Sequence, residues 1–148
     1  MLILTLQSEP RFDTIPRELK HLAHWTLLRI KLDGENALLK IPYQAQNTNQ
    51  KASPTNPNTW SSFGQAQLAF QAAKGKFAGI QFALTKDSHI TIIDIEQEYY
   101  FNTDGSLTSF AQRVIILFNS YTECSLHHGL HIIIYADKGD NANLKLYR

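Results

Sequence analysis

Two acidic residues interrupt an apolar run in the middle of the chain, in the segment TIIDIEQE (residues 91–98). The run predicts a β-strand, in which side chains two residues apart point to the same face, so Asp94 and Glu96 are expected side by side. Two carboxylates at that spacing repel each other unless a cation lies between them. Mg²⁺ and Mn²⁺ are hard cations that prefer carboxylate oxygens, so the pair is a candidate metal site. The competing interpretation is a solvated sheet face with Ile93 and Ile95 in the core, and we favour it for the bare pattern.

Three histidines follow in the segment HHGLH. A zinc site built on them would need further ligands that the sequence does not offer, because Cys124 alone is inadequate. His127 and His128 are therefore expected in an exposed loop. His131 stands at the start of an apolar run that predicts a strand, and we expect its ring to point the same way as the acidic pair. In that position the imidazole can hydrogen-bond a phosphate and stabilise charge that develops on it.

Further candidates come from a lysine and several aromatic residues. Lys40 stands near the end of a predicted strand, beside a long polar loop, and is either a point charge for a phosphate or an ordinary surface lysine. The aromatic residues that closely follow the acidic pair could stack on a base or pack against the adjacent helix; they are Tyr99, Tyr100 and Phe101. Trp25 and Trp60 are expected in the core.

The composition is that of one ordinary globular domain. The chain has 148 residues, 43% hydrophobic and 18% charged, with a formal net charge of +1. There is no overall basic signal for nucleic acid, so any basic surface has to be local. One cysteine excludes an internal disulfide framework and suits a reducing cytoplasm. We predict no membrane association, since no apolar run approaches the roughly 20 residues that span a bilayer.

The local patterns predict strands mixed with helices. Helices are expected at 15–22, with Thr14 as N-cap, at 59–73, with Thr59 as N-cap, and at 107–118. Strands are expected at 24–30, 37–43, 77–84, 90–96, 120–125 and 129–135, the first two forming a hairpin through the turn Asp33-Gly34. Residues 44–58 are expected to form a long loop and 102–105 a turn, while Leu144 begins a final strand. We therefore predict an α+β domain with a mixed, largely antiparallel central sheet and two or three flanking helices. We also expect truncation, because the chain stops in mid-strand.

The order of the motifs resembles the N-terminal primase-polymerase domain of phage and plasmid replication proteins, in the archaeo-eukaryotic primase superfamily. The matching segments run in order along nearly the whole chain: IPRELKHLAHW (15–25), KIPY (40–43), ASPTNPNTWSSF (52–63), GIQFALTKD (79–87), IDIEQE (93–98), DGSLTSFAQ (104–112), and NSYTECS followed by GLHIII.

This resemblance implies a primase-like fold and a DNA-templated nucleotidyl transferase that uses Mg²⁺ or Mn²⁺. It places the metal-binding acids at Asp94 and Glu96 and the phosphate-binding histidine at His131. Ser125 matches the start of the turn that precedes this histidine, and Lys40 and Tyr43 match the family's lysine-proline-tyrosine segment. On this resemblance Ser125, Lys40 and Tyr43 are candidate nucleotide-binding residues. The implied partners are a DNA template, (d)NTPs and a helicase, the last as a further domain or a separate protein, because no Walker motif occurs here.

One departure from the family pattern leaves two functions open. Relatives carry a third acid on the strand after the histidine strand, whereas Lys145 or Arg148 stands in the matching segment here. Either the acid lies beyond the end of this chain, and the chain is a catalytic primase or polymerase domain, or the chain is a non-catalytic nucleotide- or single-strand-binding module that retains the fold.

Overall fold

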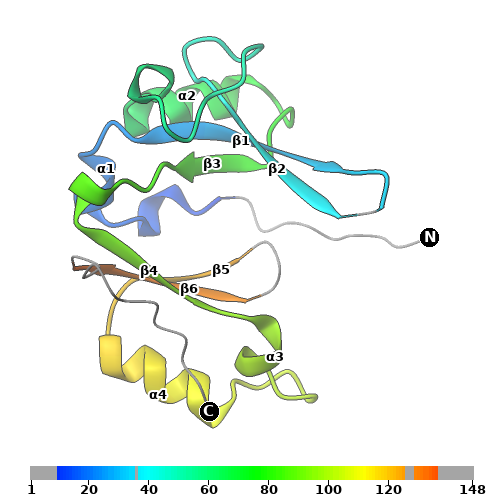
Figure 1. Cartoon of the computed structure of the whole chain (residues 1–148), viewed down its shortest axis with the longest axis vertical. Helices are drawn as coiled ribbons and strands as arrows, with labels where there is room; N and C mark the ends of the chain where they lie inside the picture. The colour runs from blue at the N-terminus through cyan, green and yellow to red at the C-terminus, as the bar shows by residue number, and fades with distance from the viewer. Residues whose placement is uncertain (1–9, 36, 126–128, 137–148) are drawn as a thin grey trace. The chain divides into compact units, whose positions relative to one another are not determined.

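Two antiparallel sheets of three strands each, with four α-helices, make up the part of the chain that the structure describes (Figure 1). The structure is a computed structural model that describes residues 10–35, 37–125 and 129–136. These residues group into two compact units, one within 1–84 and one within 85–148, each holding one sheet. The α+β class is confirmed, and that all 148 residues form a single domain stays a prediction. The expected final strand lies outside the described residues.

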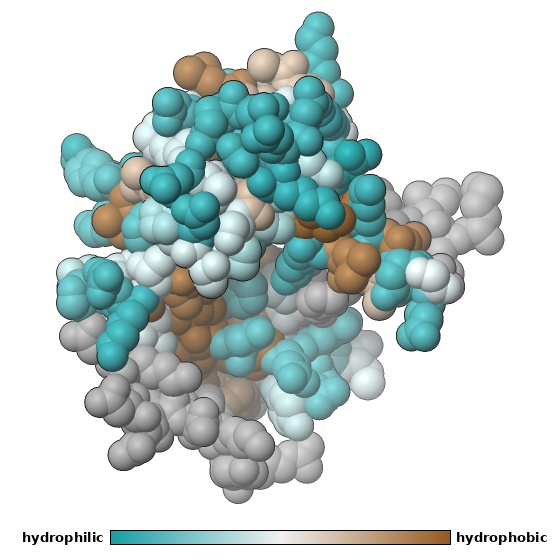
Figure 2. All heavy atoms as spheres, turned by 45° about the horizontal axis from the view of Figure 1, so that its top comes forward, coloured by the Kyte–Doolittle hydropathy of each residue, from teal (hydrophilic) through white to brown (hydrophobic). Residues whose placement is uncertain are grey.

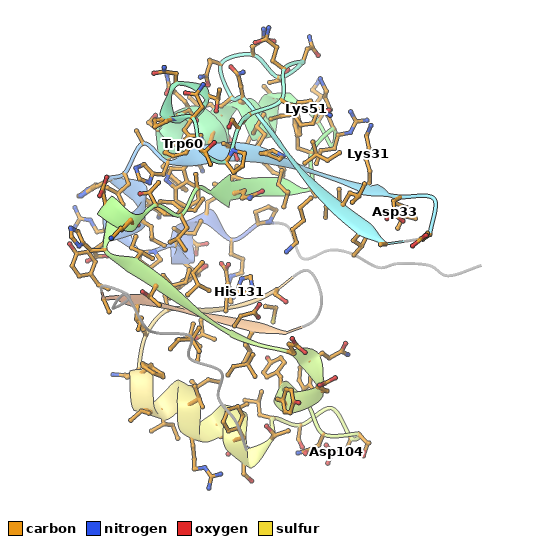
Figure 3. All side chains as sticks on the ribbon, viewed as in Figure 1. Lys31, Asp33, Lys51, Trp60, Asp104 and His131 are labelled. Atoms are coloured by element: carbon orange, nitrogen blue, oxygen red, sulfur yellow. The ribbon has the colours of Figure 1, made fainter. Side chains whose placement is uncertain are left out.

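The first sheet is built on the predicted hairpin. β1 (Trp25–Leu32) pairs antiparallel with β2 (Leu38–Tyr43) on one side and with β3 (Gly79–Phe82) on the other, in the order β2-β1-β3. The turn depends on Asp33, labelled in Figure 3, whose carboxylate accepts hydrogen bonds of 2.8 Å from the amides of Glu35 and Ala37. A side chain that bonds its own turn in this way explains why Asp-Gly predicted the hairpin correctly.

The helix of this unit begins later than predicted. α2 (Phe63–Ala72) is capped by Ser62, whose hydroxyl accepts from the amide of Gln65 while the Gln65 side chain accepts from the Ser62 amide. Thr59 is not the N-cap, because it belongs to a separate 3₁₀ turn, η2 (Pro57–Thr59). The reciprocal capping box satisfies amides that a helix leaves without an internal partner. Thr59 could not form one, because the residue three positions later is Ser62 and not the Glu or Gln of a capping box.

Replacing this cap tests the assignment. Ser62→Ala is expected to lower the free energy of unfolding by about 1 kcal/mol, because it removes the acceptor for an otherwise unpaired helix amide. Ser62→Asp is the matched control, since aspartate accepts the same hydrogen bond and should keep stability near that of the parent. Urea unfolding followed by circular dichroism measures both. An Ala variant as stable as the Asp variant would show that the cap contributes nothing.

The long polar loop predicted at 44–58 is present and is held by hydrogen bonds from residues that follow it in the chain. The Trp60 indole, labelled in Figure 3, donates to the carbonyl of Ser53 over 2.7 Å, and the Lys76 ammonium donates to the carbonyl of Thr48 over 3.1 Å. Figure 2 shows hydrophilic side chains gathered over this loop and α2. As predicted, Trp60 is buried, and so is Trp25, whose indole donates to the carbonyl of Leu19.

The N-terminal helix is shorter than predicted and has a different start. α1 spans Arg17–Lys20 and follows a 3₁₀ turn, η1 (Phe12–Thr14). Thr14 is not an N-cap, because its hydroxyl donates back to the carbonyl of Arg11 over 2.8 Å and closes η1 instead. Pro16 takes the cap position, where its fixed φ and missing N–H cost nothing.

The second unit has a sheet with helices packed on one face. β4 (Ile90–Ile95) and β5 (Thr122–Cys124) each pair antiparallel with the central β6 (Leu130–Tyr135). α3 (Gln97–Tyr100) and α4 (Ser109–Phe118) supply the rest of the core. The buried core residues come from both strands and helices: Ile95, Tyr100, Ala111, Val114, Leu130 and Ile132. The predicted turn at 102–105 is present, and hydrogen bonds from the Ser106 hydroxyl and amide lower the pKa of Asp104 (labelled in Figure 3).

We predicted one central sheet, whereas the strands of the described residues form two sheets. β3 and β4 are consecutive strands, yet they belong to different sheets, and η3 (Lys86–Ser88) and the left-handed His89 (φ 54°) stand between them. Local patterns identify extended segments but not their pairing, which depends on residues distant in sequence. None of the described helices is long and apolar enough to cross a membrane.

Candidate functional site

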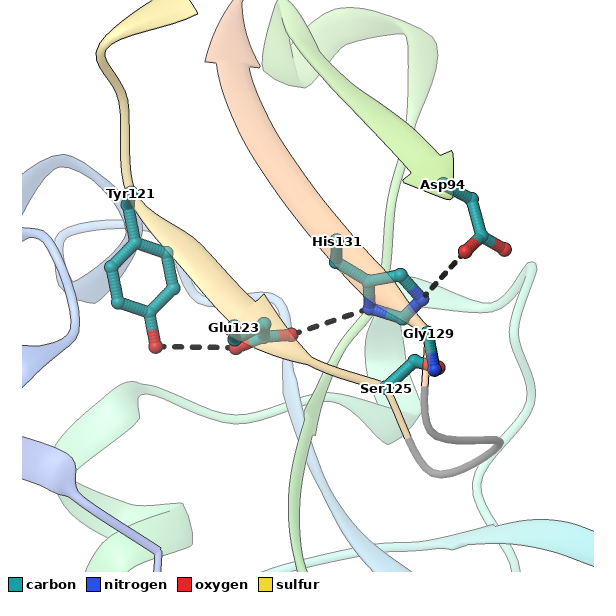
Figure 4. Close-up of polar contacts among 6 residues, drawn as sticks. All are labelled: Asp94, Tyr121, Glu123, Ser125, Gly129 and His131. Atoms are coloured by element: carbon teal, nitrogen blue, oxygen red, sulfur yellow. Dashed lines mark hydrogen bonds and ion pairs between the residues drawn. The ribbon is translucent and has the colours of Figure 1, made fainter. Parts of the chain in front are cut away.

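A polar row runs across the second sheet, one side chain from each strand (Figure 4). The backbone register places His131 of β6 directly opposite Asp94 of β4 on one side and Glu123 of β5 on the other. The His131 Nε2 atom lies 3.7 Å from an Asp94 carboxylate oxygen, and Nδ1 lies 3.5 Å from a Glu123 carboxylate oxygen. The Tyr121 hydroxyl donates to the second Glu123 oxygen over 3.1 Å. The imidazole therefore stands between two carboxylates, one of which has a further donor.

The row lies on the sheet face opposite the core of this unit. Ile95, Leu130 and Ile132 point into the core, so their alternating neighbours point the other way. The exposed fraction of the side chain is 63% for Asp94, 44% for Glu123 and 23% for His131. The prediction that His131 points the same way as Asp94 agrees with this register. The carboxylates of Asp94 and Glu123 are exposed enough to be reached by a ligand.

Glu96 lies just beyond the strand rather than within it. β4 ends at Ile95, and Glu96 is the N-cap residue of α3, with an extended backbone (φ −64°, ψ 153°). Because the backbone stays extended, the alternation continues, and the two exposed acids flank a buried Ile95.

This donor set suits a hard divalent cation. Asp94 and Glu96 offer exposed carboxylate oxygens, the ligand type that Mg²⁺ and Mn²⁺ prefer. Across residues 10–35, 37–125 and 129–136, no three His, Cys, Asp or Glu side chains are grouped closely enough to hold a metal ion. A cation on this pair would have to complete its shell with water or with oxygen atoms of a bound ligand. The zinc alternative involved His127 and His128, which lie outside the described residues.

Ser125 and Gly129 close the segment that leads into His131. The Ser125 amide donates to the Gly129 carbonyl over 2.8 Å, and the Gly129 amide donates to the Ser125 hydroxyl over 3.0 Å. A Cβ at position 129 would overlap the backbone carbonyl oxygen of Ile95 and lie 3.3 Å from the Ser125 hydroxyl. Only glycine fits there, so this close approach of β4 and the turn sets the position of the strand that carries His131.

Lys40 and Tyr43, the remaining nucleotide-binding candidates, belong to the first unit. Lys40 is exposed on β2, opposite Ile30. Tyr43 is 8% exposed and packs in the core against Leu27 and Phe77, with its ring 5.6 Å from that of Phe77. Three residues apart on a strand, the two side chains point to opposite faces, so the structure does not bring them together. The burial of Tyr43 favours a role in core packing over contact with a nucleotide.

The three aromatic residues after the acidic pair separate into two environments. Tyr100 packs in the core. The pKa of its hydroxyl is raised, mainly by burial and to a smaller extent by the nearby Cys124. Tyr99 and Phe101 are partly exposed, at 41% and 38%. The packing interpretation is therefore confirmed for Tyr100.

The sequence reasoning missed Glu123, although a signal for it exists. The strands predicted at 120–125 and 129–135 follow each other closely, which favours antiparallel pairing, and counting back from their facing ends places Glu123 opposite His131. The observed register has this pairing.

Comparison with known proteins adds no family assignment. No family model matches the sequence, and neither does any curated protein. The likeness to primase-polymerase domains therefore rests on the order of the sequence motifs.

Proposed function

We propose that this chain is a metal-dependent DNA primase or polymerase domain, of the archaeo-eukaryotic primase type, that transfers nucleotides to a primer or initiating nucleotide on a DNA template. The observation that carries the proposal is the direct pairing of Asp94 with His131 on an exposed sheet face, 3.7 Å apart. A metal-binding carboxylate and a phosphate-binding imidazole have to be neighbours if both are to act on one triphosphate.

Each residue of the site has a defined role in this proposal. Asp94 and Glu96 would hold Mg²⁺ or Mn²⁺, which when bound neutralises the triphosphate and activates the attacking hydroxyl. His131 donates a hydrogen bond to a phosphate oxygen and orients it. Ser125 binds Gly129 and so holds the start of the strand that carries His131. Lys40, an exposed residue of the first unit, stays a predicted nucleotide-binding residue. The protein supplies position and charge, as in phosphoryl transfer generally.

The proposal also includes a fold, a set of partners and a cellular location. The α+β class and the antiparallel sheets support a primase-like fold for the chain. The partners would be a DNA template and (d)NTPs, with a helicase as a further domain or a separate protein. The proposed location is the cytoplasm, for which the single cysteine is the motivating feature.

Primer extension and de novo priming on single-stranded DNA, with Mg²⁺ or Mn²⁺, test the proposal. The chain is expected to incorporate nucleotides, to lose this activity completely in EDTA and to regain it when the metal is restored. Template binding should be measured in parallel by fluorescence anisotropy. Template binding that survives EDTA, without any incorporation in either metal, would contradict catalysis and identify the non-catalytic binding module.

A further inference from the structure

Glu123 is the most firmly held member of the polar row. One carboxylate oxygen accepts from the Tyr121 hydroxyl at 3.1 Å, and the other lies 3.5 Å from Nδ1 of His131, within hydrogen-bond reach. Asp94 stands further from the ring, at 3.7 Å from Nε2, and is more exposed than Glu123. The contact that orients the imidazole is therefore the one with Glu123, and Nε2 faces Asp94 of β4 (Figure 4).

We propose that Glu123 is a positioning residue that accepts a hydrogen bond from Nδ1 of His131 and thereby keeps Nε2 directed at the substrate phosphate. This inference rests on the proposed function for what Nε2 contacts. The Nδ1–H group is a donor both in the neutral tautomer that carries this proton and in the doubly protonated ring. Glu123 therefore holds the ring in the same orientation in either state, and the doubly protonated ring is the one that binds the phosphate, because Nε2 carries no proton to donate in the neutral Nδ1–H tautomer.

Glu123 is needed because the His131 ring could otherwise rotate between two orientations. An imidazole on a sheet face that is 23% exposed can turn about its terminal bond, whose rotation is broad and roughly two-fold. A carboxylate on one ring nitrogen selects one of the two orientations, as carboxylates do behind metal-binding histidines. Tyr121 strengthens this selection because it holds the Glu123 carboxylate in turn.

Four variants of the full chain separate orientation from charge. Glu123→Met removes the acceptor and the charge, whereas Glu123→Gln removes the charge and keeps an acceptor oxygen. Tyr121→Phe removes the hydroxyl that donates to Glu123 and leaves the Glu123 carboxylate in place. Glu98→Met is the matched control, since Glu98 is an exposed glutamate of the same unit on α3. The 44% exposure of Glu123 means that these changes should leave the melting temperature nearly unchanged.

Two readouts are measured on each variant. The ¹⁵N shifts of the His131 ring, recorded at a pH where the ring is neutral, report the tautomer without any need for activity. The parent and Glu98→Met should show the Nδ1–H tautomer, and Glu123→Met should shift toward Nε2–H, with Asp94 as the remaining acceptor. The KM for the incoming nucleotide should rise about tenfold in Glu123→Met, the loss expected for a hydrogen bond to a charged group. It should rise about threefold in Glu123→Gln and in Tyr121→Phe, because a neutral or loosely held acceptor is weaker.

The outcomes distinguish this inference from the proposed function. A parent chain that incorporates no nucleotide would overturn the proposed function, while the tautomer of His131 would still decide the role of Glu123. An unchanged tautomer in Glu123→Met would overturn the positioning role whatever the activity. Equal KM values for Glu123→Gln and Glu123→Met would also overturn it, since they would indicate a role for charge alone.

Discussion

Asp94→Ala is expected to lower metal-dependent nucleotide incorporation by about 10³-fold, the largest effect of any single change in the proposed site. Asp94 lies directly opposite His131 and supplies one of the two carboxylates proposed to hold the cation. Removing it takes away one negative charge from the cation site and leaves Glu96, which lies outside the strand, as the remaining acid. Primer extension under single-turnover conditions, with saturating Mn²⁺, measures the loss.

Folding has to be separated from chemistry in this test. The Asp94 side chain is 63% exposed, so its removal should leave the circular dichroism spectrum and the melting temperature close to those of the parent. Asp87→Ala is the matched control, because Asp87 is an exposed aspartate of the same unit on η3, and it should keep full activity. Incorporation at the parental rate by a folded Asp94→Ala variant would rule out Asp94 as a metal ligand.

Gly129→Ala is expected to destabilise the second unit by about 2 kcal/mol, as overpacking of a close contact does. The added methyl group would overlap the carbonyl oxygen of Ile95 and crowd the Ser125 hydroxyl. Neither group can move away at low energetic cost, because Ile95 is a buried residue of the β4–β6 ladder and Ser125 is hydrogen-bonded to Gly129 before β6. Since the same contact sets the position of β6, we expect nucleotide incorporation to fall together with stability.

A second glycine provides the comparison for Gly129. Gly64 lies in α2, and a Cβ there would meet no atom within 4 Å. Gly64→Ala should therefore stabilise the first unit by about 0.5 kcal/mol, because alanine loses less backbone entropy in a helix. Hydrogen exchange of amides in each unit reports both changes. A Gly129→Ala variant with parental protection in β4 and β6 would contradict the close approach of Ile95 and Gly129.

The local structure of the chain was largely predictable from its sequence. Alternation of apolar and polar residues located the strands, and Asp33-Gly34 located the hairpin turn, since both depend on neighbours along the chain. The helix starts were harder, because Thr14 and Thr59 have the residue type of a cap but close 3₁₀ turns instead. A cap is decided by which amide lies within reach, and residue type alone does not specify this.

Some features of the candidate site were likewise predictable from the sequence, and others were not. Strand periodicity by itself determined that Asp94 is exposed beside a buried Ile95 and that a strand begins near His131. Only the tertiary structure decided that His131 stands between Asp94 and Glu123, that Tyr43 is a core residue, and that the strands form two sheets. The physical reason is that alternation specifies the face on which a side chain lies, whereas its neighbours on that face depend on pairing between distant segments. The acidic pair was recognised in the sequence for this reason, whereas the carboxylate behind its histidine was recognised only once the pairing of β5 with β6 was known.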